Sequence, residues 1–181
     1  MLKAPDQFET TRLSLRRPRA DDATAIFGRY ASDAEVTRFL GWPRHQSVED
    51  TRSFLAFSDA EWQRWPAGPY LILSRETGAL LGGTGFGFET QYRAITGYVL
   101  ARDAWGFGYA TEALNTIAGL APALGIRRLY ALCHPDHHAS QHVLEKGGFD
   151  REGLLRAYGE YPNLRPGVPA DTLCYARTFL T

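Results

Sequence analysis

The chain has 181 residues, a length that fits one domain, and its 44% hydrophobic and 22% charged residues are close to globular averages. The 20 basic and 20 acidic residues cancel, so the basic surplus typical of nucleic-acid-binding proteins is missing. No window approaches about 18 consecutive apolar residues, and the first six residues lack the apolar core of a secretory signal. We expect one domain over 1–181, with its core at roughly 9–178 and neither nucleic acid nor membrane as a partner.

The two cysteines, Cys133 and Cys174, are too few for a disulfide framework, which makes a reduced, cytoplasmic compartment the default expectation. Both lie in apolar, strand-like segments, where burial raises the thiol pKa and lowers reactivity. We therefore expect structural thiols, neither paired nor catalytic. A cluster of arginines near the N-terminus is expected only to solvate a face: Arg12, Arg16, Arg17 and Arg19.

Period-two alternation, helical spacing and turn residues divide the chain into alternating strands and helices. The N-terminal third is predicted to hold a strand at 12–16, a helix capped by Asp21 or Asp22 that runs towards Tyr30, a break at 41–43, and a helix that the Ser47/Asp50 capping box opens and that runs through Trp62. Strands are predicted at 70–73, 80–83 and 95–100, followed by a helix at 108–124 whose last turn Pro122 loosens. The rest of the chain is predicted to form a strand at 128–133, a helix at 139–146 stopped by Gly147-Gly148, and strands near 154–158 and 173–179. This order predicts an α/β (α+β) fold in which helices pack against a mixed sheet.

A glycine-rich turn, Trp105-Gly106-Phe107-Gly108, precedes the helix that begins near 108. Such a turn directs free backbone N–H groups towards the helix N-terminus, where the macrodipole adds roughly half a positive charge. Glycine lets the backbone approach a phosphate closely, and Thr111 adds a hydroxyl, so the turn can hold a pyrophosphate. A packing turn is the alternative interpretation. The dinucleotide fingerprint and the phosphate loop of NTPases are excluded, since the third glycine and the Gly-Lys-Ser/Thr are missing.

Several motifs occur in the order typical of one enzyme family. They are Glu9-Thr10-x-Arg12-Leu13-x-Leu15-Arg16, Gly41-Trp42-Pro43, Gly97-Tyr98-Val99-Leu100, Trp105 to Leu114, Ala139 to Phe149, Tyr161-Pro162-Asn163 and Leu173 to Ala176. In the fourth, Gly108 and Ala110 fill the last fixed positions of Gln/Arg-x-x-Gly-x-Gly/Ala, and Trp105 replaces Gln or Arg. The chain thus resembles the GNAT N-acetyltransferases, in particular the branch of the ribosomal-protein N-terminal acetyltransferases.

The resemblance implies a mixed, mostly antiparallel sheet of about seven strands, in which two parallel strands, ending at Leu100 and Cys133, splay apart. It implies acetyl-CoA as cosubstrate, with pantetheine in the gap and the thioester presented to an amine from the opposite side. The cofactor contacts it implies are Tyr98, Val99, Leu100, Trp105, Gly106, Phe107, Gly108, Tyr109, Ala110, Thr111, His137 and Ser140.

Two of these contacts need comment. After Pro135-Asp136 the family usually has Asn, whose amide steadies the cofactor; His137 stands there instead, and neutral imidazole, with one donor and one acceptor, replaces it in part. Ser140 matches a proposed general acid of the branch, which would protonate the leaving thiolate. A capping or cofactor-positioning role of Ser140 is the alternative.

The general base is the clearest departure. The branch often reads Glu-x-Gly-Tyr, and that Glu is a proposed base. This chain reads Ile95-Thr96-Gly97-Tyr98, so Ile95 stands at the position of the Glu. An α-amine with a pKa near 7.7–8 needs only about 1 kcal/mol to lose its proton at pH 7, and a lysine amine about 4.6 kcal/mol. Without the carboxylate, a protein N-terminus is the favoured acceptor, although Glu89, Glu160 or His45 could act as a base through water.

We therefore predict acetyl transfer to an amine in a ternary complex, by a monomer or homodimer. The alternatives are a small-molecule (polyamine or antibiotic) acetyltransferase and a non-catalytic acyl-CoA-binding module that has lost its base.

A metal site is a separate question. Cys133 and four histidines lie within one stretch of ten residues, and His138 and His142 are four residues apart, a spacing at which two side chains on one helix face can bind zinc. No complete four-ligand spacing accompanies them, so we predict no metal.

Overall fold

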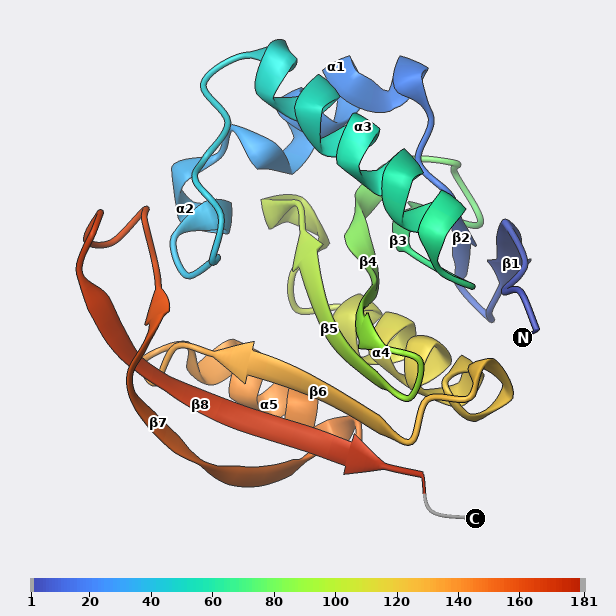
Figure 1. The fold of residues 1–181 in the computed structure, drawn as a ribbon. Helices are drawn as coiled ribbons and strands as arrows, with labels where there is room; N and C mark the ends of the chain where they lie inside the picture. Colours follow the sequence, from blue (N-terminus) through green and yellow to red (C-terminus); the bar gives the residue numbers. More distant parts are fainter. Residues whose placement is uncertain (1, 180–181) are drawn as a thin grey trace.

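The computed structural model describes residues 2–179 and contains one eight-stranded sheet with helices on both faces (Figure 1). The strand order is β1-β2-β3-β4-β5-β6-β8-β7, and every neighbouring pair is antiparallel except β5 and β6. This confirms the mixed, mostly antiparallel sheet that the sequence predicts. The predicted domain over 1–181 also includes residues 1, 180 and 181, which lie outside the described residues.

The elements follow the predicted order, with one short strand at the N-terminus and one short helix, Ala34–Thr37, that the sequence pattern did not predict. The strands are β1 (Gln7–Glu9), β2 (Leu13–Arg16), β3 (Pro69–Ser74), β4 (Leu80–Thr90), β5 (Arg93–Leu100), β6 (Arg128–Cys133), β7 (Asp150–Glu160) and β8 (Pro169–Thr178). The helices are α1 (Ala23–Ile26), α2 (Ala34–Thr37), α3 (Val48–Arg64), α4 (Tyr109–Leu120) and α5 (His138–Lys146). Strand β1 has only three residues and one half-buried side chain, too short a pattern for period-two alternation to detect.

Helix boundaries follow local chemistry. Ser47 and Asp50 form the predicted capping box at the start of α3. Helix α4 ends at Leu120, and the chain continues as a 3-10 turn that begins at Pro122, because proline lacks the N–H that another α-helical bond requires. The predicted helix towards Tyr30 is a run of three short pieces: a 3-10 turn, α1 and a π turn.

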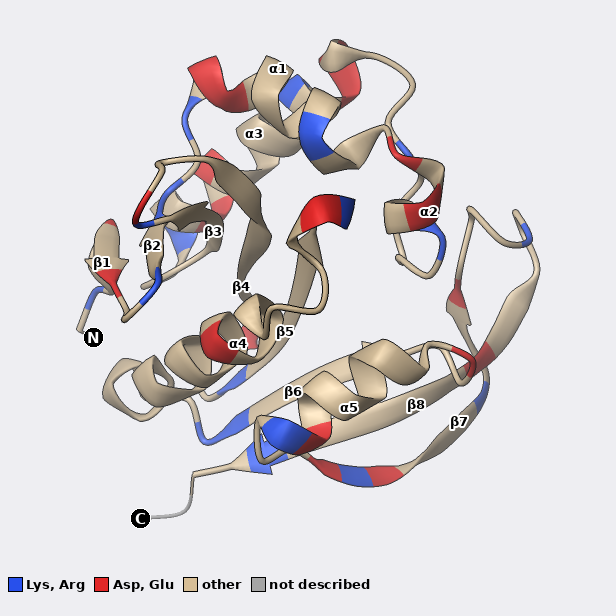
Figure 2. Cartoon of the chain, turned by 180° about the vertical axis from the view of Figure 1, so that it is seen from behind, with Lys and Arg blue, Asp and Glu red and all other residues tan. Residues whose placement is uncertain are grey.

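Two apolar clusters hold the layers together. In the larger cluster, Leu114 and Ile117 of α4 are fully buried against the sheet together with Leu129 of β6. The smaller cluster lies under α1, α2 and α3, where Ile26 and Leu55 pack on Leu71 of β3. Helices α4 and α5 therefore share one face of the sheet, while α1 to α3 cover the other face over its N-terminal half (Figures 1 and 2).

The parallel pair is short. Strands β5 and β6 pair only from Arg93 with Arg128 to Ile95 with Tyr130. Beyond Tyr130 the partner of β6 is β8 alone, and beyond Ile95 the partner of β5 is β4 alone. The two strands diverge towards their C-terminal ends, as Figure 1 shows. The predicted splay is confirmed, and beyond the short pairing one edge of β5 and one edge of β6 pair with no other strand of residues 2–179.

Candidate functional site

The gap between the splayed strands is bordered by the last residues of β5, Tyr98 to Leu100, and by Leu132 and Cys133 of β6. A free strand edge can accept an extended, amide-containing ligand as it would accept another strand. The Trp105 indole N–H donates to the Leu100 carbonyl at 2.9 Å, so that acceptor is already occupied. Backbone groups of Tyr98 and Val99 remain as candidates for an extended ligand.

The segment from Ala101 to Gly108, which we call the α4 loop, joins β5 to α4. It begins with a 3-10 turn, and the Trp105 indole then fixes it to the end of β5. Gly106 and Gly108 have φ angles of +81° and +79°, in the left-handed region that side chains with a Cβ rarely adopt. Trp105 therefore shapes the loop at the position where the family motif has Gln or Arg, and glycine is required twice by the turn that follows.

Free backbone donors gather where the α4 loop meets the helix. Within residues 2–179, no group accepts a hydrogen bond from the backbone N–H groups of residues 106–111, and the first bond of the helix runs from Glu112 to the Gly108 carbonyl. A Cβ at Gly106 would meet nothing within 4 Å, so the space in front of the turn is open. Unpaired N–H groups and the positive end of the macrodipole together fit a pyrophosphate. The residues present thus suit the phosphates of coenzyme A.

An ion-pair network from the N-terminus braces this loop. The Glu112 carboxylate accepts from the Thr10 hydroxyl at 2.6 Å and from Arg12 Nε at 2.7 Å, and Arg12 Nη1 donates to the Phe107 carbonyl at 2.8 Å. Burial opposes ionisation of Glu112, but these hydrogen bonds outweigh it and hold its pKa below the usual value. Because Arg12 neutralises Glu112, the carboxylate does not cancel the positive potential of the helix N-terminus.

The expectation that the N-terminal arginines only solvate a face is therefore wrong. Besides the contacts of Arg12, Arg16 forms two hydrogen bonds with Asp22, and Arg17 pairs with Asp59. The signal was present in the sequence, since Thr10-x-Arg12 belongs to a family motif. The 100 residues that separate Arg12 from its partner Glu112 concealed its role.

Ser140, in the first turn of α5, faces Tyr98 of β5 across the gap. The Tyr98 hydroxyl lies 2.9 Å from Ser140 Oγ and 3.0 Å from the Ser140 carbonyl oxygen. Since the carbonyl can only accept, a phenol that donates to it receives its own hydrogen bond from the serine. Burial raises the pKa of both Tyr98 and the neighbouring Cys133, so both stay protonated at neutral pH. Three protic groups thus meet at the C-terminal ends of the splayed strands.

His137, which stands where the family usually has Asn, packs against aromatic side chains at the border of the gap. Its ring stacks on Phe39 at 4.8 Å, next to His134, which packs edge-on against Tyr161. Burial lowers the pKa of His137, which favours the neutral ring. Phe39 belongs to what we call the α2 segment, residues 34–45.

Asn163 holds the α2 segment in place from the loop between β7 and β8. Its amide nitrogen donates to the carbonyls of Thr37 and Trp42 at 2.7 and 2.9 Å, and its amide oxygen accepts from Arg44 N at 2.8 Å. Asn163 was part of a family motif in the sequence, with no role assigned. Its three bonds close one side of the gap.

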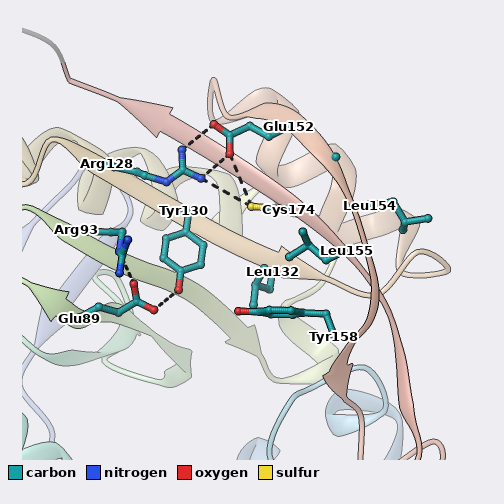
Figure 3. Close-up of a pocket in the computed structure, with 11 residues that line it drawn as sticks. Glu89, Arg93, Arg128, Tyr130, Leu132, Glu152, Leu154, Leu155, Tyr158 and Cys174 are labelled. Carbon is teal, nitrogen blue, oxygen red and sulfur yellow. Dashed lines mark hydrogen bonds and ion pairs between the residues drawn. The ribbon is translucent and has the colours of Figure 1, made fainter.

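The position of the missing base lies on the face opposite α4 and α5. Ile95 pairs with Tyr130, and this face carries a hollow of about 590 Å³ lined in part by Tyr130, Leu132 and Tyr158 (Figure 3). The Glu89 carboxylate in this hollow accepts from the Tyr130 hydroxyl and pairs with Arg93 at 2.6 Å. Both carboxylate oxygens of Glu89 are therefore engaged by other side chains.

The other two candidate bases differ from each other. His45 Nδ1 lies 2.8 Å from the Thr51 hydroxyl, and burial lowers the pKa of His45, so the ring is neutral. Glu160 ends β7 and is exposed.

In the described part of the chain, no three His, Cys, Asp or Glu side chains gather where they could share a metal ion. No helix between residues 2 and 179 is both long and apolar enough to cross a membrane.

Splayed parallel strands beside a glycine-rich helix N-terminus define the class of acyl-CoA-dependent transferases. The family described as the acetyltransferase (GNAT) domain matches residues 12–150. The uncharacterized N-acetyltransferase YoaA of Bacillus subtilis is 36% identical over 172 residues, which cover 93% of this chain and 94% of YoaA. The chain belongs to the GNAT acetyltransferases: it is an N-acetyltransferase, and acetyl-CoA is its cosubstrate.

Solved structures agree with this assignment. The Salmonella typhimurium acetyl transferase that modifies the N-terminal serine of 50S ribosomal subunit protein L7/L12 has a TM-score of 0.82 and 26% identity, covering 94% of this chain and 97% of its own. RimL in complex with coenzyme A has a TM-score of 0.80 and 25% identity, covering 94% and 96%. The microcin C7 self immunity acetyltransferase MccE, with acetyl-CoA and AMP, has a TM-score of 0.85 over 97% and 98%, and at 21% identity it shows the fold alone.

Proposed function

We propose that this acetyltransferase acts on the α-amine of a protein N-terminus, by direct attack of the amine on acetyl-CoA in a ternary complex. The observation that carries the proposal is the aliphatic Ile95 at the point where the strands begin to separate. The nearby Glu89 carboxylate is engaged by Tyr130 and Arg93. A site without a free carboxylate favours an amine that is already partly deprotonated. That is true of an α-amine with a pKa near 7.7–8 and not of a lysine amine near 10.4.

The same proposal assigns the cofactor contacts. Pantetheine pairs with the free edge of β5 through backbone groups of Tyr98 and Val99, near Leu100. The pyrophosphate lies over residues 106–111, with Thr111 adding its hydroxyl, and His137 borders the pantetheine end. All of these groups belong to one catalytic domain spanning 1–181.

Ser140 is the proposed proton donor to the leaving group. When the neutral amine attacks the thioester carbonyl, the C–S bond breaks and its electron pair leaves with the sulfur. The thiolate takes a proton from Ser140 Oγ, and the proton that the attacking nitrogen loses on becoming an amide returns through water to Ser140 Oγ, so that protons balance over the cycle. The contact between Ser140 Oγ and the Tyr98 hydroxyl supports this role, because it holds the Ser140 hydroxyl at the gap.

The acceptor approaches from the face opposite α4 and α5, where the hollow of Figure 3 begins at Tyr130 and Leu132. The likeness to the Salmonella typhimurium enzyme, which modifies an N-terminal serine, supports a protein N-terminus as the acceptor. The aromatic side chains of Phe39 and Trp42 in the α2 segment offer apolar contact to the residues that follow the amine.

The acceptor class is tested by measuring coenzyme A release with peptides, spermidine and lysine as acceptors between about pH 6 and 9. For peptide α-amines, the rate is expected to rise with pH and level off near about 8, the pKa of the amine itself. The Ile95→Glu variant restores the carboxylate and is expected to help spermidine and lysine more than peptides. A wild-type enzyme that acetylates spermidine or an antibiotic amine faster than any peptide at pH 7 would contradict the proposal.

The role of Ser140 is tested separately with Ser140→Ala and Tyr98→Phe. Loss of a general acid lowers kcat by roughly 10²-fold or more at unchanged acetyl-CoA affinity. A role limited to cofactor positioning weakens acetyl-CoA binding in proportion to the loss of rate. A Ser140→Ala enzyme with full kcat would remove the acid assignment and leave the acceptor proposal untouched.

A further inference from the structure

The hollow of Figure 3 extends from the gap across the face of the sheet opposite α4 and α5, and we call it the β7 hollow. Strands β4 to β8 line it, with Glu89 and Arg93 at one end and Arg128 and Glu152 at the other (Figure 3). Its volume of about 590 Å³ is in the usual range for ligand sites.

The charged side chains of the β7 hollow compensate one another. Arg93 Nε donates to one Glu89 oxygen at 2.6 Å, and the Tyr130 hydroxyl donates to the other. Arg128 donates through Nη1 and Nη2 to the two oxygens of Glu152. A charged side chain that entered the hollow would lose water without gaining a free partner, so the hollow favours an uncharged occupant.

An apolar wall lies between the two ion pairs. It is formed by Leu132 of β6 and by three residues of β7, Leu154, Leu155 and Tyr158 (Figure 3). Leu154 and Tyr158 are 39% and 58% exposed, although both side chains are large and mainly apolar. An apolar group placed against this wall would remove that surface from water, which is favourable.

A bulge in β7 directs Tyr158 towards the wall. Four residue steps along β7, from Leu155 to Gly159, face only two steps along β8. Ala157, inside the bulge, has a φ of +46° and is the only residue other than glycine at positive φ within residues 2–179. This conformation is costly for a residue with a Cβ, so neighbouring contacts must impose it.

Contacts with β8 impose the bulge from both sides. Asp171 Oδ1 accepts a hydrogen bond from the Ala157 N–H at 2.9 Å. Two residues further on, Gly159 lies so close to β8 that a Cβ there would collide with Thr172 Oγ1, which is buried. The position of Tyr158 is therefore set by β8 and not by the exposed edge of the sheet.

The β7 hollow is continuous with the gap between the splayed strands. Strands β5 and β6 stop pairing after Ile95 and Tyr130, and Leu132, the first residue of the apolar wall, lies about 7 Å further along β6. An acceptor that reaches the gap from this face therefore passes the apolar wall with the residues that follow its amine.

We propose that the β7 hollow binds a large apolar side chain at the second or third residue of the acceptor, with Tyr158 as the residue that determines this preference and Asp171 as a positioning residue. The proposal rests on the proposed function, because it takes the acceptor to be a protein N-terminus. Acidic and basic side chains at the same places find no free partner in the hollow, so peptides that carry them are poor acceptors.

A purely structural role of the bulge makes a different prediction. Strand β7 is the last strand of the sheet, and bulges at such edges hinder pairing with other chains. Loss of that protection would affect self-association in the same way with every acceptor. Only a contact with the acceptor changes the preference between two peptides that differ in one side chain, so the experiment measures that preference.

Coenzyme A release is measured with peptides that are identical except for Leu, Ala, Asp or Lys at the second or the third residue. For the wild type, kcat/KM is expected to be about tenfold higher with Leu than with Ala at one of these positions, the lower limit for methylene groups bound in an apolar pocket, and lower still with Asp and Lys. Tyr158→Ala is expected to lose most of the preference for Leu. The matched control is Tyr92→Ala, because Tyr92 is 57% exposed and lies outside the hollow, and it is expected to keep the preference.

The positioning role of Asp171 is tested with a pair of variants. Asp171→Asn keeps an oxygen that can accept from the Ala157 N–H, and Asp171→Ala does not. We expect Asp171→Ala to lose the preference for Leu as Tyr158→Ala does, and Asp171→Asn to retain it. Both variants lose the ion pair with the exposed Arg156, so that loss cannot explain a difference between them.

Four results would overturn the inference. Equal kcat/KM with the Leu and Ala peptides in the wild type removes the subsite and leaves the proposed function intact. A Tyr158→Ala enzyme that keeps the full preference removes Tyr158 as its determinant. A wild type that sediments as a dimer, with Tyr158→Ala as a monomer, assigns the hollow to a second copy of this chain. Activity on spermidine or lysine with none on any peptide removes both the inference and the proposed function.

Discussion

The α4 loop and the α2 segment border the same gap, and they are built in different ways. The α4 loop presents backbone N–H groups, and its shape depends on Gly106 and Gly108 at positive φ. The α2 segment presents side chains, with Phe39 stacked on His137, and its carbonyls are held by Asn163. The α4 loop therefore uses backbone N–H groups, which almost every residue type has, and the α2 segment uses side chains, which differ between residue types.

This difference separates what the family shares from what an individual member selects. A cosubstrate common to all members can be held by backbone donors whatever the neighbouring side chains are. An acceptor that differs between members must be recognised by side chains. In the proposed site these come from the α2 segment, from His134 after β6 and from Tyr161 after β7, which pack together. We therefore expect mutations of the α4 loop to act on acetyl-CoA and mutations of the α2 segment to act on the acceptor.

The largest effect is expected at Gly108. A Val there would need a φ of +79° and would project towards the phosphates, so Gly108→Val is expected to weaken acetyl-CoA binding by at least about 100-fold. Gly125 has the same φ and ψ, +79° and 8°, far from the gap, so Gly125→Val carries the same backbone strain. Calorimetry on both folded variants separates the two effects. Unchanged acetyl-CoA affinity in Gly108→Val would count against the phosphate site.

A smaller effect, confined to the other wall, is expected at Asn163. In Asn163→Asp an oxygen replaces the nitrogen that donates to the Thr37 and Trp42 carbonyls, so three acceptors face one another and the α2 segment loses its anchor. We expect KM for the peptide acceptor to rise about tenfold, with little change for acetyl-CoA. A change in acetyl-CoA affinity as large as the change in acceptor KM would break the division between the two walls.

The Glu112 network is expected to add a modest, pH-dependent stability to the α4 loop. Because the pKa of Glu112 is lowered on folding, its contribution is fully present above the unfolded value, near 4.5, and is lost as pH falls through the folded pKa. With half-exposed Arg12 as partner, it is worth at most about 1 kcal/mol. Urea unfolding of the wild type and Glu112→Gln should differ at pH 7 and converge in acid. A difference that grows in acid would contradict the assignment.

No effect is expected from mild alkylation. Cys133 and Cys174 are free and buried, and burial raises the pKa of both thiols. Native protein treated with iodoacetamide at neutral pH should keep its activity, and only the denatured chain should expose two thiols. Rapid inactivation of the native enzyme would show that Cys133, beside Ser140, is accessible from the gap.

Much of the fold could be predicted from the sequence, because the deciding signals are local. The capping box at Ser47 and the glycine stop after Lys146 act within one helical turn, and each begins or ends a helix as predicted. Pro122, predicted to loosen the last turn of a helix reaching 124, ends the α-helix at Leu120 and turns its last residues into a 3-10 turn. The glycine turn before α4 was equally readable, since a positive φ restricts which residues are allowed.

Contacts between distant segments could be decided only by the tertiary structure. The partner of Arg12 lies 100 residues away, and Asn163 reaches Thr37 across 126 residues, so no periodicity or spacing connects them. The sheet register decided that Glu89 meets Tyr130 and Arg93 next to Ile95, and the packing of α5 on α4 decided that Lys146 faces a pocket. Local chemistry determined the glycine turn that we propose as the cosubstrate site, and long-range packing determined the side-chain walls that surround it.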